Sequence, residues 1–187
     1  MRIFNKPLRF AASALLFTIT AQVSAASLVV GDKAPDFEVT TLTGETFRLS
    51  DYTGEKPVCL KFWATWCSYC KVEMPHLQSI HNQYGDYVEV LAVNVGINDS
   101  VANIEQFFNS GGFNLPTTID QQGDLVSAYG VVGTPHHLLI NKEGEIAYRT
   151  FLASDTLDSM VEAWADEGAE ERAQKSMKKS KRKKWKR

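Results

Sequence analysis

A short apolar run followed at once by two closely spaced cysteines limits the folds open to this chain more than any other feature. Residues 58–64 (VCLKFWA) are β-prone, and apolar side chains recur at helical spacing over residues 71–84. Cys67 and Cys70 therefore lie where a strand passes into a helix. Unpaired N–H groups and the positive end of the helix dipole stabilise an anion such as a thiolate at that point. The spacing predicts a dithiol that opens and closes as a disulfide.

Cysteine pairs of this spacing also occur in zinc sites, which need four ligands. The only other cysteine is Cys59, and the helix offers His76 and His81, which are five residues apart rather than the four that would align them. The sequence therefore favours a redox pair over a structural zinc site. Cys59 itself is expected to be a buried, inert thiol.

Residues 1–25 have the three parts of a secretory signal peptide. A basic start is followed by an almost wholly apolar stretch at 10–21 and by small residues at 23–25. Cleavage after Ala25 is the preferred reading and cleavage after Ala26 the alternative. An uncleaved anchor stays open, although the apolar stretch is shorter than the roughly 20 residues that a membrane span needs. The signal predicts export, most simply to a bacterial periplasm, where dithiols take part in disulfide chemistry.

Charge is segregated along the chain. Residues 26–171 hold seven Lys or Arg against 22 Asp or Glu, a net charge of −15, whereas residues 172–187 hold ten Lys or Arg and no acid. A block of like charge this long is normally disordered and solvated. It is suited to an anionic membrane surface, to an acidic partner or to the acidic body itself, and Trp185 favours the membrane. Export argues against nucleic acid as a partner.

The body, residues 26–171, is long enough for one domain with a proper core and shows no repeat or second domain. The pattern predicts a hairpin, a strand, a helix, a second strand, two further helices, a second hairpin and a last helix. We expect these at residues 37–49, 58–64, 68–84, 88–95, 99–108, 124–129, 137–151 and from 154 onward. Strand–helix–strand units followed by an antiparallel pair and a helix predict an α/β sandwich on a mixed sheet.

Four motifs follow one another in the body: VGDKAPDF at 30–37, FWATWCSYC at 62–70, EMP at 73–75 and YGVVGTP at 129–135. On these residues the chain resembles the thioredoxin fold, and more closely the exported TlpA/ResA-like thiol–disulfide oxidoreductases of the redoxin, or AhpC/TSA-like, superfamily. The resemblance covers about residues 28–165. It implies a thioredoxin-like three-layer sandwich with a central mixed sheet, helices on both faces and an N-terminal β-hairpin. It also implies a cis peptide bond before Pro135.

The resemblance assigns roles to five residues. Cys67 is the attacking thiolate, and Cys70 resolves the mixed disulfide that Cys67 forms. Pro135 packs against the dithiol and leaves the backbone of Thr134 free to pair with a strand of the substrate. Trp66 lies beside the site as an apolar platform for the partner, with simple packing as the alternative. The implied activity is reduction of protein disulfides, extending to cytochrome c maturation, with a membrane thiol or electron donor as second partner and no cofactor.

Lys61 departs from the thioredoxin pattern. Six residues before the first cysteine, thioredoxins carry a buried acid that relays a proton, and this chain has a lysine there. If Lys61 points at Cys70, it favours thiolates or, when neutral, serves as a base. In the other interpretation Lys61 snorkels outward and pairs with an acid such as Glu73. The sequence leaves both open, so a proton relay is not carried over to this chain.

The sequence also has features of two other functional classes, a peroxiredoxin-like peroxidase and a metal-binding module. Peroxiredoxins share much of this layout, but Leu60 and Ala64 replace the proline and threonine of their Pro-x-x-x-Thr-x-x-Cys motif. The second is a copper- or zinc-binding module, because His136 and His137 follow Pro135 and are soft ligands near the two cysteines. Strand alternation aims only one of them inward, so a redox enzyme without a bound metal is the preferred interpretation.

Overall fold

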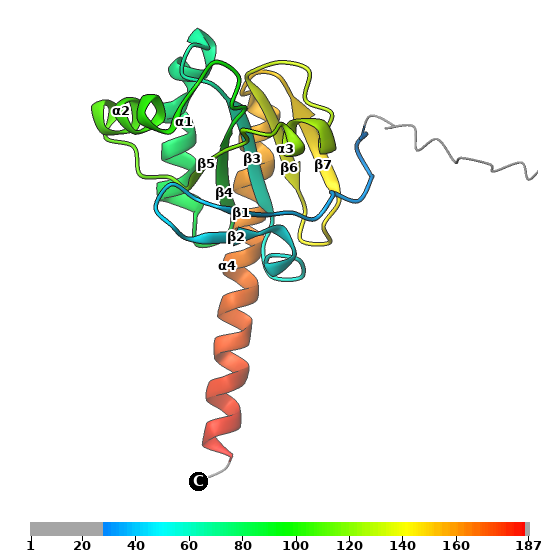
Figure 1. The fold of residues 1–187 in the computed structure, drawn as a ribbon. Coiled ribbons are helices and arrows are strands. Elements are labelled where there is room, and N and C mark those ends of the chain that lie inside the picture. The colour runs from blue at the N-terminus through cyan, green and yellow to red at the C-terminus, as the bar shows by residue number, and fades with distance from the viewer. Residues whose placement is uncertain (1–27, 186–187) are drawn as a thin grey trace, which may run out of the picture.

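A computed structural model describes residues 28–185 of the chain (Figure 1). At its centre is a five-stranded mixed sheet in the order β5-β4-β3-β6-β7. The strands are β3 (Val58–Trp63), β4 (Glu89–Asn94), β5 (Thr117–Ile119), β6 (His136–Ile140) and β7 (Ile146–Thr150). β3 pairs in parallel with β4 and antiparallel with β6, and all six of its residues are buried. A strand covered on both faces needs a continuous apolar run, which is what residues 58–63 supply, Lys61 apart.

Helices cover both faces of the sheet. They are α1 (Ser68–Tyr84), α2 (Val101–Gly111), α3 (Asp124–Ala128) and α4 (Asp155–Lys184). α1 and α4 pack against each other on one face (Figure 1). On the other face Phe62 of β3 meets Tyr129, which directly follows α3, with the ring centroids 6.0 Å apart. This arrangement confirms the predicted sandwich with helices on both faces.

β1 (Glu38–Thr40) and β2 (Thr46–Arg48) form an N-terminal hairpin, and a single 3₁₀ turn, Leu49–Asp51, follows it. Phe37 stacks on Phe47 and meets the edge of Tyr129, with ring centroids 5.8 and 5.9 Å apart. The hairpin itself is as the sequence predicts, and these contacts place it on the second face of the sheet. The strand β5 was not predicted: it has only three residues and follows Pro116.

The C-terminal residues differ from the prediction of a disordered tail. α4 continues as one helix of 30 residues to Lys184 and projects from the body (Figure 1). Ala, Glu, Gln, Arg, Lys and Met dominate its second half, and all are strong helix formers. The helix also carries its acids first and its bases last, which complements the helix dipole. Intrinsic propensity thus outweighs the repulsion between like charges.

The predicted signal peptide, residues 1–25, lies outside the described residues. Within residues 28–185 no helix combines the length and the apolar character needed to cross a membrane.

Candidate redox-active site

The two cysteines sit at the junction that the sequence predicts. α1 begins at Ser68, and Cys67 is its N-cap residue, whose Sγ accepts a hydrogen bond from the backbone N–H of Cys70 at 3.2 Å. A disulfide joins Cys67 to Cys70. Cys67 is 6% exposed, whereas Cys70, one turn into the helix, is fully buried. An incoming group therefore reaches Cys67 first, and Cys70 has access only to Cys67.

The loop that leads into β6 lies at the same end of the sheet. The register pairs His136, the first residue of β6, with Phe62, so Pro135 comes level with the end of β3 from which the cysteine loop departs. The Thr134–Pro135 peptide bond is cis, as the resemblance implies. Arg149 of β7 anchors this loop by donating hydrogen bonds to the carbonyls of Tyr129 and Gly130, at 3.0 and 3.3 Å.

Large apolar side chains are exposed in the two segments that carry the dithiol and Pro135. Trp66 is 52% exposed, Tyr69 68% and Val132 85%, and they come from the cysteine motif and from the loop before Pro135. The indole N–H of Trp66 donates to the carbonyl of Ile97 at 2.7 Å, which fixes one edge of the ring and leaves a face open to solvent. A fixed, exposed aromatic ring next to a reactive sulfur suits contact with a partner protein.

Lys61 pairs with an acid, as the second interpretation predicts, but it is buried rather than exposed. Its Nζ forms an ion pair with Oε2 of Glu73 at 2.7 Å, so the paired interpretation names the right partner. The outward path is wrong, because Lys61 has no exposed surface. Burial lowers the pKa of the lysine, and the hydrogen bond and charge of Glu73 oppose that effect.

Glu73 is the site residue whose importance the sequence analysis underestimated. Burial alone raises the pKa of its carboxyl group, but hydrogen bonds from His137, Lys61 and the backbone of Ala153 outweigh burial and lower the pKa to about 2. His137 Nε2 lies 3.0 Å from Oε2, and the Ala153 N–H donates to Oε1 at 2.8 Å. The carboxylate is thus held as a permanent anion three residues after Cys70. The sequence signal that could have identified Glu73 is its spacing from Cys70, because positions i and i+3 of a helix share a face.

The two histidines after Pro135 enter separate networks on opposite sides of the sheet. His137 reaches Glu73 beneath α1, whereas His136 accepts a hydrogen bond from Arg149 Nε at 3.1 Å and meets the ring of Phe151. Strand alternation therefore separates them, as predicted. Across residues 28–185, no three His, Cys, Asp or Glu side chains are grouped so that they could hold a metal ion.

Cys59 is a buried free thiol, as expected, and burial raises its pKa to about 12. It sits on β3 eight residues before Cys67 and is fully shielded from solvent. A thiol in that state does not compete with the dithiol for substrates.

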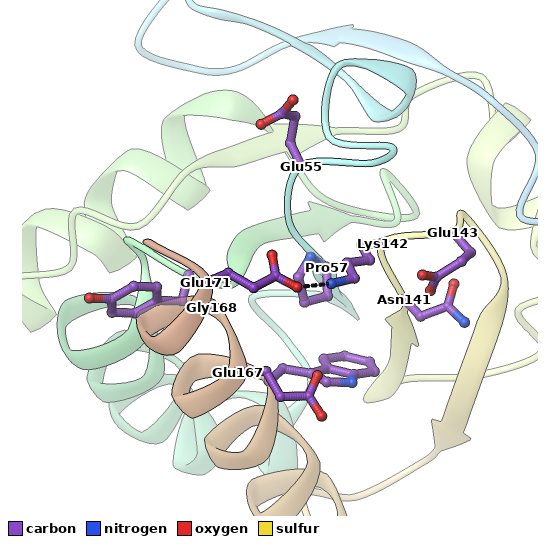
Figure 2. A pocket seen from close by; sticks show the side chains of 10 residues that line it. Glu55, Pro57, Asn141, Lys142, Glu143, Glu167, Gly168 and Glu171 are labelled. Carbon is purple, nitrogen blue, oxygen red and sulfur yellow. Dashed lines mark hydrogen bonds and ion pairs between the residues drawn. The ribbon is translucent and has the colours of Figure 1, made fainter. Parts of the chain in front are cut away.

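A hollow of about 160 Å³ lies elsewhere on the molecule, between α4 and the turn that joins β6 to β7. Four glutamates surround it, and one of them, Glu171, pairs with Lys142 at 2.5 Å (Figure 2). The glutamates are Glu55, Glu143, Glu167 and Glu171. No residue of the dithiol region lines this hollow, so it is separate from the candidate site and reflects the acidic character of the body.

Comparison with known sequences agrees with this geometry. The model of the AhpC/TSA family matches residues 30–149. The thiol–disulfide oxidoreductase ResA of Geobacillus thermodenitrificans is 41% identical over 137 residues, which make up 72% of this chain and 77% of that protein. ResA of Bacillus subtilis is 39% identical over 139 residues, 71% of this chain and 74% of that protein.

Solved structures of similar fold are also thiol–disulfide exchange proteins. A putative thiol:disulfide interchange protein DsbE from Chlorobium tepidum superposes with a TM-score of 0.66 at 30% identity, covering 74% of this chain and 99% of that one. The exposed lipoprotein thioredoxin Etrx1 of Streptococcus pneumoniae gives a TM-score of 0.60 at 34% identity, covering 71% and 99%. The residues that the family model matches, 30–149, include both cysteines, strands β1 to β6 and helices α1 to α3.

Proposed function

Because this chain belongs to the AhpC/TSA family and is a thiol–disulfide oxidoreductase related to ResA, we propose that it works as a reductase of protein disulfides outside the cytoplasm. The observation that carries the proposal is the pairing of a reachable Cys67 with a buried Cys70 at the start of α1. The substrates are exported proteins that hold two cysteines as a disulfide, apocytochromes c among them.

The reaction needs two exchange steps. The Cys67 thiolate attacks one sulfur of the substrate disulfide, forms a mixed disulfide and releases the other substrate sulfur as a thiolate. Cys70 then gives up its proton and attacks Cys67 Sγ, which breaks the mixed disulfide and frees the second substrate thiol. Two electrons pass to the substrate, and the protein is left with the Cys67–Cys70 disulfide. A thiol or electron donor at the membrane must reduce it again.

Three further residues serve the substrate in this proposal. The backbone of Thr134 pairs with an extended segment of the substrate, and Pro135, which has no N–H, packs against the dithiol. Trp66 supplies the apolar contact beside Cys67. Its half-exposed ring and its bond to the Ile97 carbonyl support that role.

The test of the activity is reduction of insulin or a model disulfide by the mature protein. Cys67→Ser should abolish reduction, Cys70→Ser should accumulate a mixed disulfide with substrate, and Cys59→Ser should leave the rate unchanged because Cys59 is buried and outside the reaction. Equal activity in all three variants would refute the assignment. The direction follows from the reduction potential: values below about −230 mV fit a reductase, whereas about −120 to −180 mV fits an oxidant or isomerase.

We further propose that the basic end of α4 holds the protein at an anionic membrane surface. Five bases at helical spacing line one side of the end of α4. They are Lys175, Lys178, Lys179, Arg182 and Lys183. This part of the helix projects from the body (Figure 1). Each base near an anionic leaflet contributes about 1 kcal/mol, and Trp185, 91% exposed, adds an interfacial ring. Such docking would keep the dithiol close to its donor in the membrane.

Cosedimentation with vesicles tests the docking. The protein should bind vesicles of mixed phosphatidylglycerol and phosphatidylcholine, bind less at high salt, and ignore pure phosphatidylcholine. Replacing the five bases by Gln keeps strong helix formers in place and should remove the binding, as should deletion of residues 172–187. Unchanged binding after the deletion would overturn the membrane proposal and leave the reductase proposal intact.

A further inference from the structure

A buried hydrogen-bond chain links three elements, among them the helix that carries the dithiol. Lys61 of β3 and His137 of β6 both reach Oε2 of Glu73 on α1, at 2.7 and 3.0 Å. Lys61 is fully buried and His137 is 2% exposed. Backbone pairing supports the chain, because Lys61 and His137 are register partners in adjacent strands.

The chain fixes the tautomer of His137. An ionised carboxylate only accepts hydrogen bonds, so His137 Nε2 must carry the hydrogen that it donates to Glu73. In the neutral ring Nδ1 then keeps its lone pair. Nδ1 is buried and has no hydrogen-bond partner within the described part of the chain. A buried, unpartnered acceptor in an otherwise satisfied network calls for an explanation.

The fold places this ring on the same face of the sheet as the helix that carries the second cysteine. Glu73 follows Cys70 by three residues on α1, so the two side chains lie on one face of the helix. His137 lies on β6 and its Nε2 reaches Glu73 of α1, so its side chain points to the face of the sheet that α1 covers. The ring therefore lies on the side of the sheet that carries the dithiol helix, joined to that helix by Glu73.

We propose that His137 is the base that accepts the proton of the Cys70 thiol, directly or through one water, in the step that closes the disulfide. The proton moves from Cys70 Sγ to His137 Nδ1, and the resulting thiolate attacks Cys67 Sγ as the bond between Cys67 and the substrate breaks. The proton leaves His137 afterwards for the departing substrate thiolate or for solvent. Glu73 stabilises the imidazolium that forms in between, and Lys61 keeps Glu73 ionised. This role rests on the reductase reaction proposed above.

The charged and buried surroundings of His137 keep its ring neutral, so that it can accept a proton. Burial lowers the pKa of His137, Glu73 opposes that effect, and the charge of Lys61 lowers the pKa again. The ring is therefore neutral at neutral pH, as a base must be. Titratable groups reach this region from three packed elements, namely Cys59 and Lys61 on β3, Glu73 and His76 on α1, and Asp158 on α4, which pairs with His76.

Stopped-flow reaction of the reduced protein with an aromatic disulfide that releases a coloured thiol separates the two steps. Attack by Cys67 releases the first thiol, and attack by Cys70 releases the second. In the wild type the second phase should be nearly independent of pH around neutrality. In His137→Gln, whose amide can still donate to Glu73 but has no basic nitrogen, the second phase should slow by about 100-fold. It should then rise about tenfold per pH unit with the ionisation of Cys70 itself.

His136→Gln is the matched control, because His136 is equally buried but belongs to the Arg149 network on the opposite side of the sheet. It should keep a wild-type second phase, and the first phase should be wild-type in both variants. Equal second phases in His137→Gln and wild type would overturn the proposal. If His137→Gln does not fold, the wild-type profile decides alone, since a second phase that rises tenfold per pH unit without a plateau excludes the base. Loss of the first phase in the wild type would refute the reductase reaction instead.

Discussion

At the residue scale, Lys61 is a buried positive charge that depends on one counter-charge, the carboxylate of Glu73. An ammonium group without solvent contact is costly, and it is tolerated only because Glu73 lies 2.7 Å away. Glu73 in turn holds two more hydrogen bonds, from His137 and from the backbone of Ala153. Loss of Lys61 therefore leaves Glu73 with two hydrogen-bond donors, whereas loss of the Glu73 charge leaves Lys61 buried without a counter-charge. The second change should cost more stability.

This asymmetry predicts the outcome of a double-mutant cycle. Glu73→Gln should reduce the free energy of unfolding by about 3 to 5 kcal/mol because it strands a buried charge. Lys61→Met should cost less, because Glu73 keeps its other two donors. The double variant should be more stable than Glu73→Gln alone. Urea unfolding at neutral pH, with the disulfide intact, measures all four proteins, and additive effects of the two substitutions would contradict the coupling.

His136 supports a prediction on acid stability. Burial and the neighbouring Arg149 lower its pKa to about 4, so the folded state holds it neutral. The unfolded chain binds a proton at an ordinary pKa near 6.5, so the contribution of His136 is complete above that pH and is lost as pH falls toward 4. The free energy of unfolding should fall by up to about 1.4 kcal/mol per pH unit for this one proton.

The measurement is a series of denaturant titrations between neutral and acid pH. In His136→Gln the free energy of unfolding should depend less steeply on pH between about 6.5 and 4. Part of the dependence should remain, because the pKa of His137 is also lowered. A slope identical to that of the wild type would show that His136 does not carry the linkage.

At the element scale, Asp99 joins two loops that frame the dithiol. It accepts hydrogen bonds from the N–H and the hydroxyl of Thr65, at 2.7 and 2.8 Å, and from Asn94 at 2.8 Å. Thr65 lies between β3 and α1, two residues before Cys67, while Asp99 lies between β4 and α2. One carboxylate thus sets the path of the cysteine loop relative to the neighbouring strand.

Asp99→Ala should lower both stability and rate. It leaves the donors of Thr65 and Asn94 unsatisfied, at about 1 to 3 kcal/mol for each buried group, and frees the loop that carries Trp66 and Cys67. Ser100→Ala is the control: it removes the N-cap of α2, should cost about 1 kcal/mol, and should leave disulfide reduction unchanged. Unfolding and insulin-reduction assays on the same samples separate the two effects, and a normal rate in Asp99→Ala would rule out a positioning role.

The elements also show what can be deduced from sequence here. β3, α1 and β4 carry unbroken apolar or helical periodicity, and each lies within two residues of its predicted place. β5 was not predicted because Thr117–Ile119 is too short to show the alternation of apolar and polar residues that marks a strand. The pair of Lys61 with Glu73 was one of the two predicted alternatives, but the third member, His137, was not predicted. The three residues come from three elements, and only the packing of α1 on β3 and β6 brings them together. Local patterns predict elements, whereas a buried polar network depends on tertiary register.

At the scale of the whole molecule, charge and shape are segregated together. The acidic body carries the dithiol, and the basic end of α4 projects away from it (Figure 1). Arg172 contacts the body through the carbonyl of Asp86 and the ring of Tyr87. Residues 173–183 are exposed throughout. A helix segment with so few neighbours depends mainly on its own propensity. The pKa of Glu171, at the edge of the body, is lowered chiefly by the hydrogen bond and charge of Lys142, and the charge of Lys175 one turn later adds to that effect.

Deletion of residues 173–187 should therefore leave the body as stable as before. The free energy of unfolding should change by less than about 0.5 kcal/mol, because no buried contact is lost. The helical signal in circular dichroism should fall, and disulfide reduction in solution should continue at the same rate. If the basic segment instead folded back on the acidic body, deletion would destabilise the body most at low salt, where the attraction is least screened. Denaturant unfolding of both proteins at low and high salt distinguishes a projecting helix from a self-docked one.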